Sequence, residues 1–571
     1  MEVETMTLDY VTNRIQKVIT ISENRVVIGI LFIGQFLFLL CGIHKEPVVY
    51  DEGFMVYYAE KVLNGGIPYR DFITAQAPGQ FYTLAALFKM FGSSLLVERL
   101  WDTLARWAVS LLVYIIAAKL TSRRIAFVAW IAVTLLISAY SRGFNYGYGI
   151  FPSIAFGLLG VSCLLEHISR RKPFLLIGSG ISIALSTFYR YDLGFYTCIC
   201  IGLTYAAFVF LDHKERHDQL IKRIFATVQS MIPLVAAVVI PLIPLFCYLI
   251  VAVPIDELRY DILVYPTTIH GIHGLPYPPL LPKQLSIQAL DKWVRFYLPL
   301  FVFTIAPLWG ALSLVEKQNP NQRSIRVWGV ILLTLLGLAF FLQAWDRADI
   351  IHLIPASIPA LVLLVTMVAN LPRPLRTIYC VAPICFLIII LSYFYIAMPA
   401  RRHLHATKEA FLHPAQSSKL VRAGSVAIKE DQEQAVLYIQ NHTAPSEPIF
   451  VGNSRHDRIF INDLLFYFLA ARRSPTKYDH LIPGIATTLP VQKHIVEDLM
   501  NSKVRFVITW SGFENHLEPN KGGESSGITV LDEFIRSNYQ IVDHFGDYSI
   551  WQKNQKRTSL HQGYAAQKNQ G

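Results

Sequence analysis

The chain has 571 residues, of which 53% are hydrophobic and only 16% are charged, and its formal net charge is +11 at neutral pH. Soluble domains of average composition carry about 25% charged residues, so this low charged fraction indicates that part of the chain is in contact with lipid. Most lysine and arginine residues lie in short segments between apolar runs, which argues against a nucleic-acid partner. All seven cysteines lie in apolar runs, so neither a disulfide framework nor a zinc site is indicated.

Long apolar runs dominate the first 400 residues of the chain. A helix needs about 20 apolar residues to cross a bilayer core of about 30 Å. The sequence holds about eleven runs of roughly this length. They lie at 26–43, 94–119, 125–140, 149–165, 173–189, 193–211, 228–253, 294–315, 327–343, 351–370 and 377–398. We therefore expect a polytopic α-helical membrane protein with a transmembrane domain at residues 26–398.

Basic residues mark alternate loops between these runs. They include Arg123-Arg124, Arg170-Arg171, Lys222-Arg223, Arg323 with Arg326, and Arg373 with Arg376. The positive-inside rule predicts that these loops and the N-terminal residues 1–25 are cytoplasmic. An odd number of helices then places the C-terminus on the extracytoplasmic side. We expect a multi-pass protein of the plasma or inner membrane.

After residue 398 the pattern changes to that of a soluble α/β domain, which we expect at 399–552 on the extracytoplasmic side. Apolar, β-branched segments at 449–452 and 504–510 predict strands, and a hairpin is expected near 548–551. Amphipathic segments at 463–473 and 490–501 predict helices. No cofactor motif is present, so we interpret the domain as a lid or as a docking surface for an acceptor. Residues 553–571 form a polar tail.

The most informative segment is the first predicted outer loop, residues 44–93. Asp51 and Glu52 directly follow the first apolar run, and residues 54–63 predict an amphipathic helix that lies flat at the membrane interface. Adjacent carboxylates at that boundary cost free energy unless they are paired or used, and such a carboxylate suits a general base. The structural alternative is a helix N-terminus whose acids complement the helix dipole.

This loop resembles the first outer loop of the GT-C superfamily of membrane glycosyltransferases. It is most similar to the family of protein O-mannosyltransferases and the lipid A aminoarabinose transferase. The shared features are Asp51-Glu52 after the first helix, a turn from Gly65 to Phe72, Pro78 at a helix start, and Phe91-Gly92 before the second span. The paired prolines usual in that family are reduced to Ala77-Pro78, which puts the subfamily in doubt more than the superfamily.

The resemblance implies a reaction and a set of partners. It implies inverting transfer of a sugar from a polyprenyl- or dolichyl-phosphate carrier to an acceptor hydroxyl outside the cytoplasm. The acceptor is a glycan, a lipid or a protein, and membrane lipid surrounds the site. Asp51 corresponds to the base, Glu52 to a group that assists or orients it, and Asp71 to a second acidic position that orients the acceptor or the base. No cofactor is implied with certainty, and a divalent metal is left open because relatives differ.

A leaving lipid phosphate needs cationic hydrogen-bond donors. The candidates are Arg190, at an outer helix end, and His352 and Arg347, which precede a Leu-x-Pro helix start like one in the family. Two of them have a structural alternative, because Arg190 can pair with Asp192 and His352 can be a satisfied histidine at the membrane edge.

Two other classes of function compete with the enzyme. A transporter or lipid flippase needs polar residues in mid-span and broken helices in paired positions, and no internal repeat supports this. A non-catalytic membrane scaffold leaves the paired acids of the first loop without a role. The enzyme hypothesis predicts that Asp51, Asp71 and a basic residue converge on one cavity.

Overall fold

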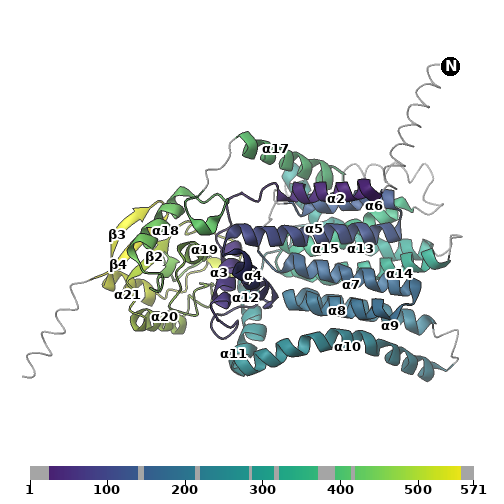
Figure 1. The fold of residues 1–571 in the computed structure, drawn as a ribbon, viewed down its shortest axis with the longest axis horizontal. Helices are drawn as coiled ribbons and strands as arrows, with labels where there is room; N and C mark the ends of the chain where they lie inside the picture. The colour runs from purple at the N-terminus through teal and green to yellow at the C-terminus, as the bar shows by residue number, and fades with distance from the viewer. Residues whose placement is uncertain are drawn as a thin grey trace, which may run out of the picture.

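The computed structural model describes residues 25–138, 147–212, 219–281, 286–313, 320–370, 392–412 and 418–554. Figure 1 shows two parts, a bundle of long helices and a smaller α/β unit at one end of it, with α3, α4 and α12 between them. We call residues 418–554 the tail unit.

The bundle helices occupy the expected apolar runs. They are α2 (Arg25–Leu40), α5 (Leu95–Leu120), α6 (Arg123–Leu136), α7 (Ile150–Arg170), α8 (Pro173–Tyr189), α9 (Tyr191–Asp212), α10 (Leu220–Ala252), α13 (Ile287–Ser313), α14 (Pro320–Asp346) and α15 (Ile350–Ala369). Among the described residues, seven helices are long and apolar enough to cross a membrane, and α2 and α8 are shorter apolar helices. Most of the eleventh expected run, 377–398, lies outside the described residues.

Local sequence signals set the helix ends and the lipid-facing surface. The hydroxyls of Ser94 and Ser122 accept hydrogen bonds from the first turns of α5 and α6, which is the usual role of serine at an N-cap. Pro173 occupies the first turn of α8, where its missing N–H costs nothing. α10 lies at the side of the bundle in Figure 1, and its apolar side chains are mostly exposed, as suits contact with lipid.

The tail unit contains a four-stranded mixed sheet in the order β1-β2-β4-β3. The strands are β1 (Phe450–Asn453), β2 (Phe506–Trp510), β3 (Tyr539–Phe545) and β4 (Tyr548–Lys553). β1 and β2 are parallel and wholly buried, which explains their continuous apolar sequences. The helices are α18 (Glu430–His442), α19 (Leu465–Ala470), α20 (Leu489–Asn501) and α21 (Val530–Asn538), with short 3-10 turns η5 (Val421–Ala423) and η6 (Lys521–Gly523).

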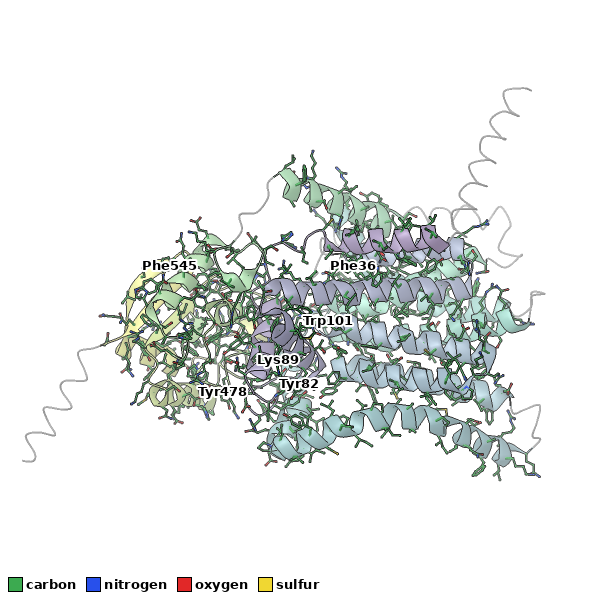
Figure 2. All side chains as sticks on the ribbon, in the orientation of Figure 1. Phe36, Tyr82, Lys89, Trp101, Tyr478 and Phe545 are labelled. Carbon is green, nitrogen blue, oxygen red and sulfur yellow. The ribbon has the colours of Figure 1, made fainter. Side chains whose placement is uncertain are left out.

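The connecting layer comes from residues 51–91 and 255–273. Its elements are α3 (Asp51–Leu63), α4 (Gly79–Phe91), α11 (Ile255–Arg259), η2 (Tyr260–Val264) and α12 (Tyr265–His273). η4 (Tyr393–Ala397) and α17 (Met398–Leu412) pack instead against the bundle, where His403 of α17 stacks on Phe38 of α2. In the view of Figure 2, Tyr82 and Lys89 of α4 lie between Trp101 of the bundle and Tyr478 of the tail unit.

The surroundings of α3 differ from the expectation of a helix lying flat in lipid. Residues 52–59 are all buried, and α3 packs between α4 and α19 in one hydrophobic cluster that includes the tail unit. The approach is so close that a Cβ on Gly53 would come within 2.4 Å of the backbone nitrogen of Leu465. Tyr57 stacks on Tyr467 with ring centroids 4.8 Å apart. The apolar face of α3 is therefore covered by protein, and the start of α3 is fixed against both parts of the molecule.

Candidate active site

A cavity of about 440 Å³ lies where the bundle, the connecting layer and the tail unit meet. It brings together side chains that are far apart in the sequence. The residues that matter for chemistry are Tyr50, Asp51, Tyr148, Arg190, His273, Arg347, Asp349, His352, Phe460, His480 and Phe513. Four of the six residues predicted from the sequence, Asp51, Arg190, Arg347 and His352, therefore share one cavity.

Asp51 begins α3, and its carboxylate faces this cavity. The hydroxyl of Tyr148 donates a 2.9 Å hydrogen bond to Oδ1 of Asp51. Burial, and secondarily the charge of Asp51, raise the pKa of Tyr148 well above its usual value, so the phenol stays protonated and remains a donor. A carboxylate held in one orientation at the wall of a cavity is suited to accept a proton from a bound hydroxyl.

Glu52 does not line the cavity, although it is the neighbour of Asp51 in sequence. It is buried in an ion pair with Arg99 of α5, in which Nε lies 2.5 Å from Oε1 and Nη2 lies 3.0 Å from Oε2. The backbone N–H of Val48 also donates to Oε2, at 3.3 Å. This bidentate geometry fixes the first turn of α3 against the bundle, and so fixes the place of Asp51.

Asp71 also lies away from the cavity, on the turn before α4. Its carboxylate accepts hydrogen bonds from Arg70 at 2.9 and 2.8 Å and from the backbone N–H of Ile67 at 2.7 Å. The guanidinium of Arg70 holds the pKa of Asp71 below its usual range. The expected convergence of Asp71 with Asp51 is not observed, and its role in orienting the acceptor or the base stays a prediction.

Arg190 lies at the C-terminal end of α8, on the bundle side of the cavity. It donates to the carboxylate of Asp192 through Nε at 2.9 Å and Nη2 at 3.2 Å. Nε2 of Gln343 donates to the same carboxylate at 2.5 Å. The pairing with Asp192 that the sequence left open is therefore present, and it holds the guanidinium at the cavity wall.

The turn between α14 and α15 contributes Arg347, and the first turn of α15 contributes His352. Arg347 donates to Glu518 of the tail unit at 2.6 and 3.0 Å, to Asp349 at 2.8 Å and to the carbonyl of His273 at 2.5 Å. Asp349 caps α15 and accepts from the backbone N–H of His352 at 3.0 Å and from its ring Nδ1 at 2.7 Å.

The charge state of Asp349 determines which ring nitrogen of His352 can form a hydrogen bond with a ligand. Burial opposes ionisation of Asp349, but the contacts with His352 and Arg347 outweigh it and lower the pKa of this carboxyl. An ionised carboxylate accepts the Nδ1–H of His352, which leaves Nε2 as the ring atom for a ligand in the cavity.

His480 is a cavity residue that the sequence did not reveal. Its ring lies 4.9 Å from that of Tyr50 and 4.7 Å from that of Phe54. Both ring nitrogens are buried and have no hydrogen-bond partner among the described residues. Burial, and then the proximity of His273, lower the pKa of His480 to about 3, so it is neutral at physiological pH. A neutral imidazole offers one donor and one acceptor.

The sequence signals for the other missed residues were partial. Tyr148 belongs to an aromatic segment that resembles either a sugar platform or an interfacial belt, and His273 belongs to a His-x-x-His segment that lies on α12. Within the described part of the chain, no group of three or more His, Cys, Asp or Glu residues could hold a metal ion.

Comparisons with known proteins support the architecture. No family model and no curated protein matches the sequence. The structure is similar to ArnT from Cupriavidus metallidurans bound to undecaprenyl phosphate, with a TM-score of 0.52 at 11% identity over 92% of this chain and 98% of that chain. It is also similar to the apo oligosaccharyltransferase from Archaeoglobus fulgidus, with a TM-score of 0.50 at 11% identity over 84% of this chain and 69% of that chain.

Both neighbours are transferases of the GT-C fold, so the resemblance found in the first loop is confirmed at the level of the fold. Together with the apolar helices, this likeness identifies a multi-pass membrane protein of the GT-C fold.

Proposed function

We propose that this chain is an inverting glycosyltransferase. It moves a sugar from a polyprenyl-phosphate carrier to the hydroxyl of an acceptor on the extracytoplasmic side of the membrane. The observation that carries this proposal is that one cavity, beside the apolar bundle, is lined by the carboxylate of Asp51 and by the cationic or proton-donating groups of Arg190 and His352. The fold neighbour bound to undecaprenyl phosphate supports a lipid phosphate as the carrier.

The reaction follows from the chemistry of these groups. The carboxylate of Asp51 takes the proton of the acceptor hydroxyl as its oxygen attacks the anomeric carbon. The bond from that carbon to the phosphate oxygen breaks, and the phosphate leaves with the electron pair. Attack on the side opposite the phosphate inverts the anomeric configuration. The negative charge that develops on the phosphate is stabilised by donors from Arg190 and His352.

Arg347 has a different set of contacts from Arg190. Its guanidinium already meets Glu518, Asp349 and a backbone carbonyl, whereas the carboxylate that Arg190 contacts is Asp192. We therefore assign phosphate binding first to Arg190 and His352. Arg347 joins the bundle to the tail unit at the same cavity, and its contact with phosphate stays a prediction that a variant pair below tests.

Three neighbours position the base. Tyr148 fixes the orientation of Oδ1 of Asp51, and the pair of Glu52 with Arg99 fixes the helix start that carries Asp51. Such preorganisation matters because a general base has to be within about 2.6–3.2 Å of the proton that it takes. Removing a positioning group should lower the rate of transfer without removing the binding of the donor.

The test uses membranes that contain the chain and a panel of radiolabelled polyprenyl-phosphate sugars, each assayed with and without EDTA. Transfer of label to a water-soluble or lipid-linked product supports the enzyme, and the anomeric configuration of that product reports whether the reaction inverts. Loss of transfer in EDTA that Mg²⁺ or Mn²⁺ restores would add a metal to the reaction. Retention of configuration would overturn the single-displacement mechanism, and no transfer from any donor would favour a transporter or flippase.

A further inference from the structure

The tail unit forms one whole side of the proposed active site. Phe460, His480 and Phe513 reach the cavity from three different loops of that unit, while Arg190 and His352 reach it from the bundle. The two sides differ in chemistry, since the bundle side carries the guanidinium of Arg190 and the imidazole of His352, and the tail side is aromatic with a neutral imidazole. This division separates a side suited to a lipid phosphate from a side suited to a different ligand.

His480 indicates that the ligand on the tail side forms hydrogen bonds with the protein. Buried polar groups in folded proteins are almost always hydrogen-bonded, and an exception calls for an explanation. Both ring nitrogens of His480 lack a partner among the described residues, and the side chain lines the cavity. A neutral imidazole that offers one donor and one acceptor complements a hydroxyl group, which also offers both.

Aromatic side chains continue from the cavity to the outer surface. The rings of Phe460 and Phe513 lie 5.8 Å apart, and His516 lies 4.4 Å from Phe460 and 5.7 Å from Phe513. Phe513 remains 37% exposed, although it is a large apolar residue. Aromatic faces present a flat apolar surface, and the C–H face of a sugar ring is its natural complement.

A second, shallow hollow adjoins the cavity and shares Phe460 and Phe513 with it. It lies beyond the carboxyl ends of the parallel strands β1 and β2, the position where open α/β sheets bind ligands. Arg458 lines this hollow and donates to the backbone carbonyl of Glu514 at 2.9 Å. The hollow itself has a volume of only about 10 Å³, which is room for about one water, so the aromatic pair at its edge is the part suited to a second sugar unit.

We propose, on the basis of the proposed function, that the tail unit carries the acceptor subsite and that the acceptor is an oligosaccharide. The reacting sugar lies in the cavity, with a hydroxyl on His480. The next unit stacks on Phe460 and Phe513.

Binding of oligosaccharides tests this proposal. The full chain, purified in detergent, is applied to an array of immobilised neutral and acidic mono- to hexasaccharides. Two variants remove the proposed contacts: His480→Phe keeps an aromatic ring beside Tyr50 but removes both nitrogens, and Phe513→Ala removes the exposed ring. Phe411→Ala is the matched control, because Phe411 is 84% exposed on α17 and lines neither hollow.

We expect the wild type and the control to bind oligosaccharides more tightly than the corresponding monosaccharides. Each test variant should weaken binding by about tenfold, the scale of one lost aromatic or hydrogen-bonded contact. Binding of polyprenyl phosphate, measured on the same samples, should be unchanged in both variants and shows that they are folded.

Several outcomes would overturn the acceptor proposal. They are no binding to any oligosaccharide, equal binding by the variants, or selective binding of unstructured peptides or lipid vesicles in place of glycans. Failure of the proposed function is distinguishable, because oligosaccharide binding that depends on Phe513, together with no transfer from any lipid-linked donor, would keep the glycan subsite and reject the transferase.

Discussion

The hydroxyl of Tyr148 donates a 2.9 Å hydrogen bond to Oδ1 of Asp51, and the two residues are 97 positions apart in the chain. Tyr148 lies two residues before the start of α7, whereas Asp51 begins α3. The bond therefore connects the start of a bundle helix to the proposed base in the connecting layer, inside the cavity that also holds Arg190 and His352.

Tyr148→Phe should slow transfer while the fold is kept. We expect a decrease of about 10- to 100-fold in kcat, because the carboxylate loses the group that orients it and one hydrogen bond to a charge is worth about 1.5–3 kcal/mol. An unchanged kcat would show that Tyr148 does not position the base.

Glu52→Gln should destabilise the protein more than it changes the chemistry directly. It leaves Arg99 as a buried charge without its carboxylate, and breaking one side of such a pair costs about 3–5 kcal/mol. Thermal unfolding in detergent measures the loss. The double variant Glu52→Gln, Arg99→Met should recover much of it because the unpaired charge is gone. A Glu52→Gln variant as stable as the wild type but inactive would instead support a direct role for Glu52 in assisting the base.

Variants of Arg347 and Glu518 test whether Arg347 only connects the bundle to the tail unit or also binds the phosphate of the donor. If Arg347 serves only to hold the tail unit, then Arg347→Gln and Glu518→Gln should have similar effects, because each removes the same ion pair. Both should increase hydrogen exchange in the loop 511–529. If Arg347 also binds phosphate, Arg347→Gln should weaken the binding of polyprenyl phosphate by about tenfold or more, whereas Glu518→Gln should not.

Asp261 should make stability depend on pH. This carboxyl on η2 is buried and accepts a 3.1 Å bond from the backbone N–H of Thr74, and burial raises its pKa to about 7. The folded state therefore binds a proton that the unfolded state has released between about pH 4 and 7. Stability from this group is complete at low pH and is lost as the pH rises through 7.

Asp261→Asn removes that titration and keeps an acceptor for Thr74. We expect the variant to be more stable than the wild type at pH 8, by up to a few kcal/mol, and the dependence of its unfolding temperature on pH between 4 and 7 to be flatter. Unfolding curves for both proteins across this range provide the measurement. Parallel curves would mean that Asp261 is already ionised in the folded protein.

The bundle helices were predictable from sequence because the length of an apolar run is a local property. The surroundings of α3 could not be predicted from the sequence. Phe54 and Tyr58 are covered by protein, whereas the pattern suggested contact with lipid. Lipid and a protein core both favour the same apolar residues. The pattern fixes which face is apolar and says nothing about what covers it.

The candidate site was partly predictable for the same reason. Three of the predicted residues lie next to helix ends: Asp51, Arg190 and His352. The resemblance of the first loop to a known family also indicated Asp51. His480 and Glu518 reach the cavity only because the tail unit folds back onto the bundle, and no local pattern records a contact across more than 150 residues. The separation of Asp71 from Asp51 depends on the turn that Arg70 stabilises, which a motif does not specify.

The most direct test of the central claim compares sugar transfer by the wild type, Asp51→Asn and Asp212→Asn at matched expression in membranes supplied with radiolabelled polyprenyl-phosphate sugars. Asp212 pairs with Arg171 and ends α9, away from the cavity, so it controls for loss of a carboxylate elsewhere. If Asp51 is the base, transfer falls by about a thousandfold or more only in Asp51→Asn, while donor binding persists. Transfer by Asp51→Asn at the wild-type rate would contradict the assignment of the base.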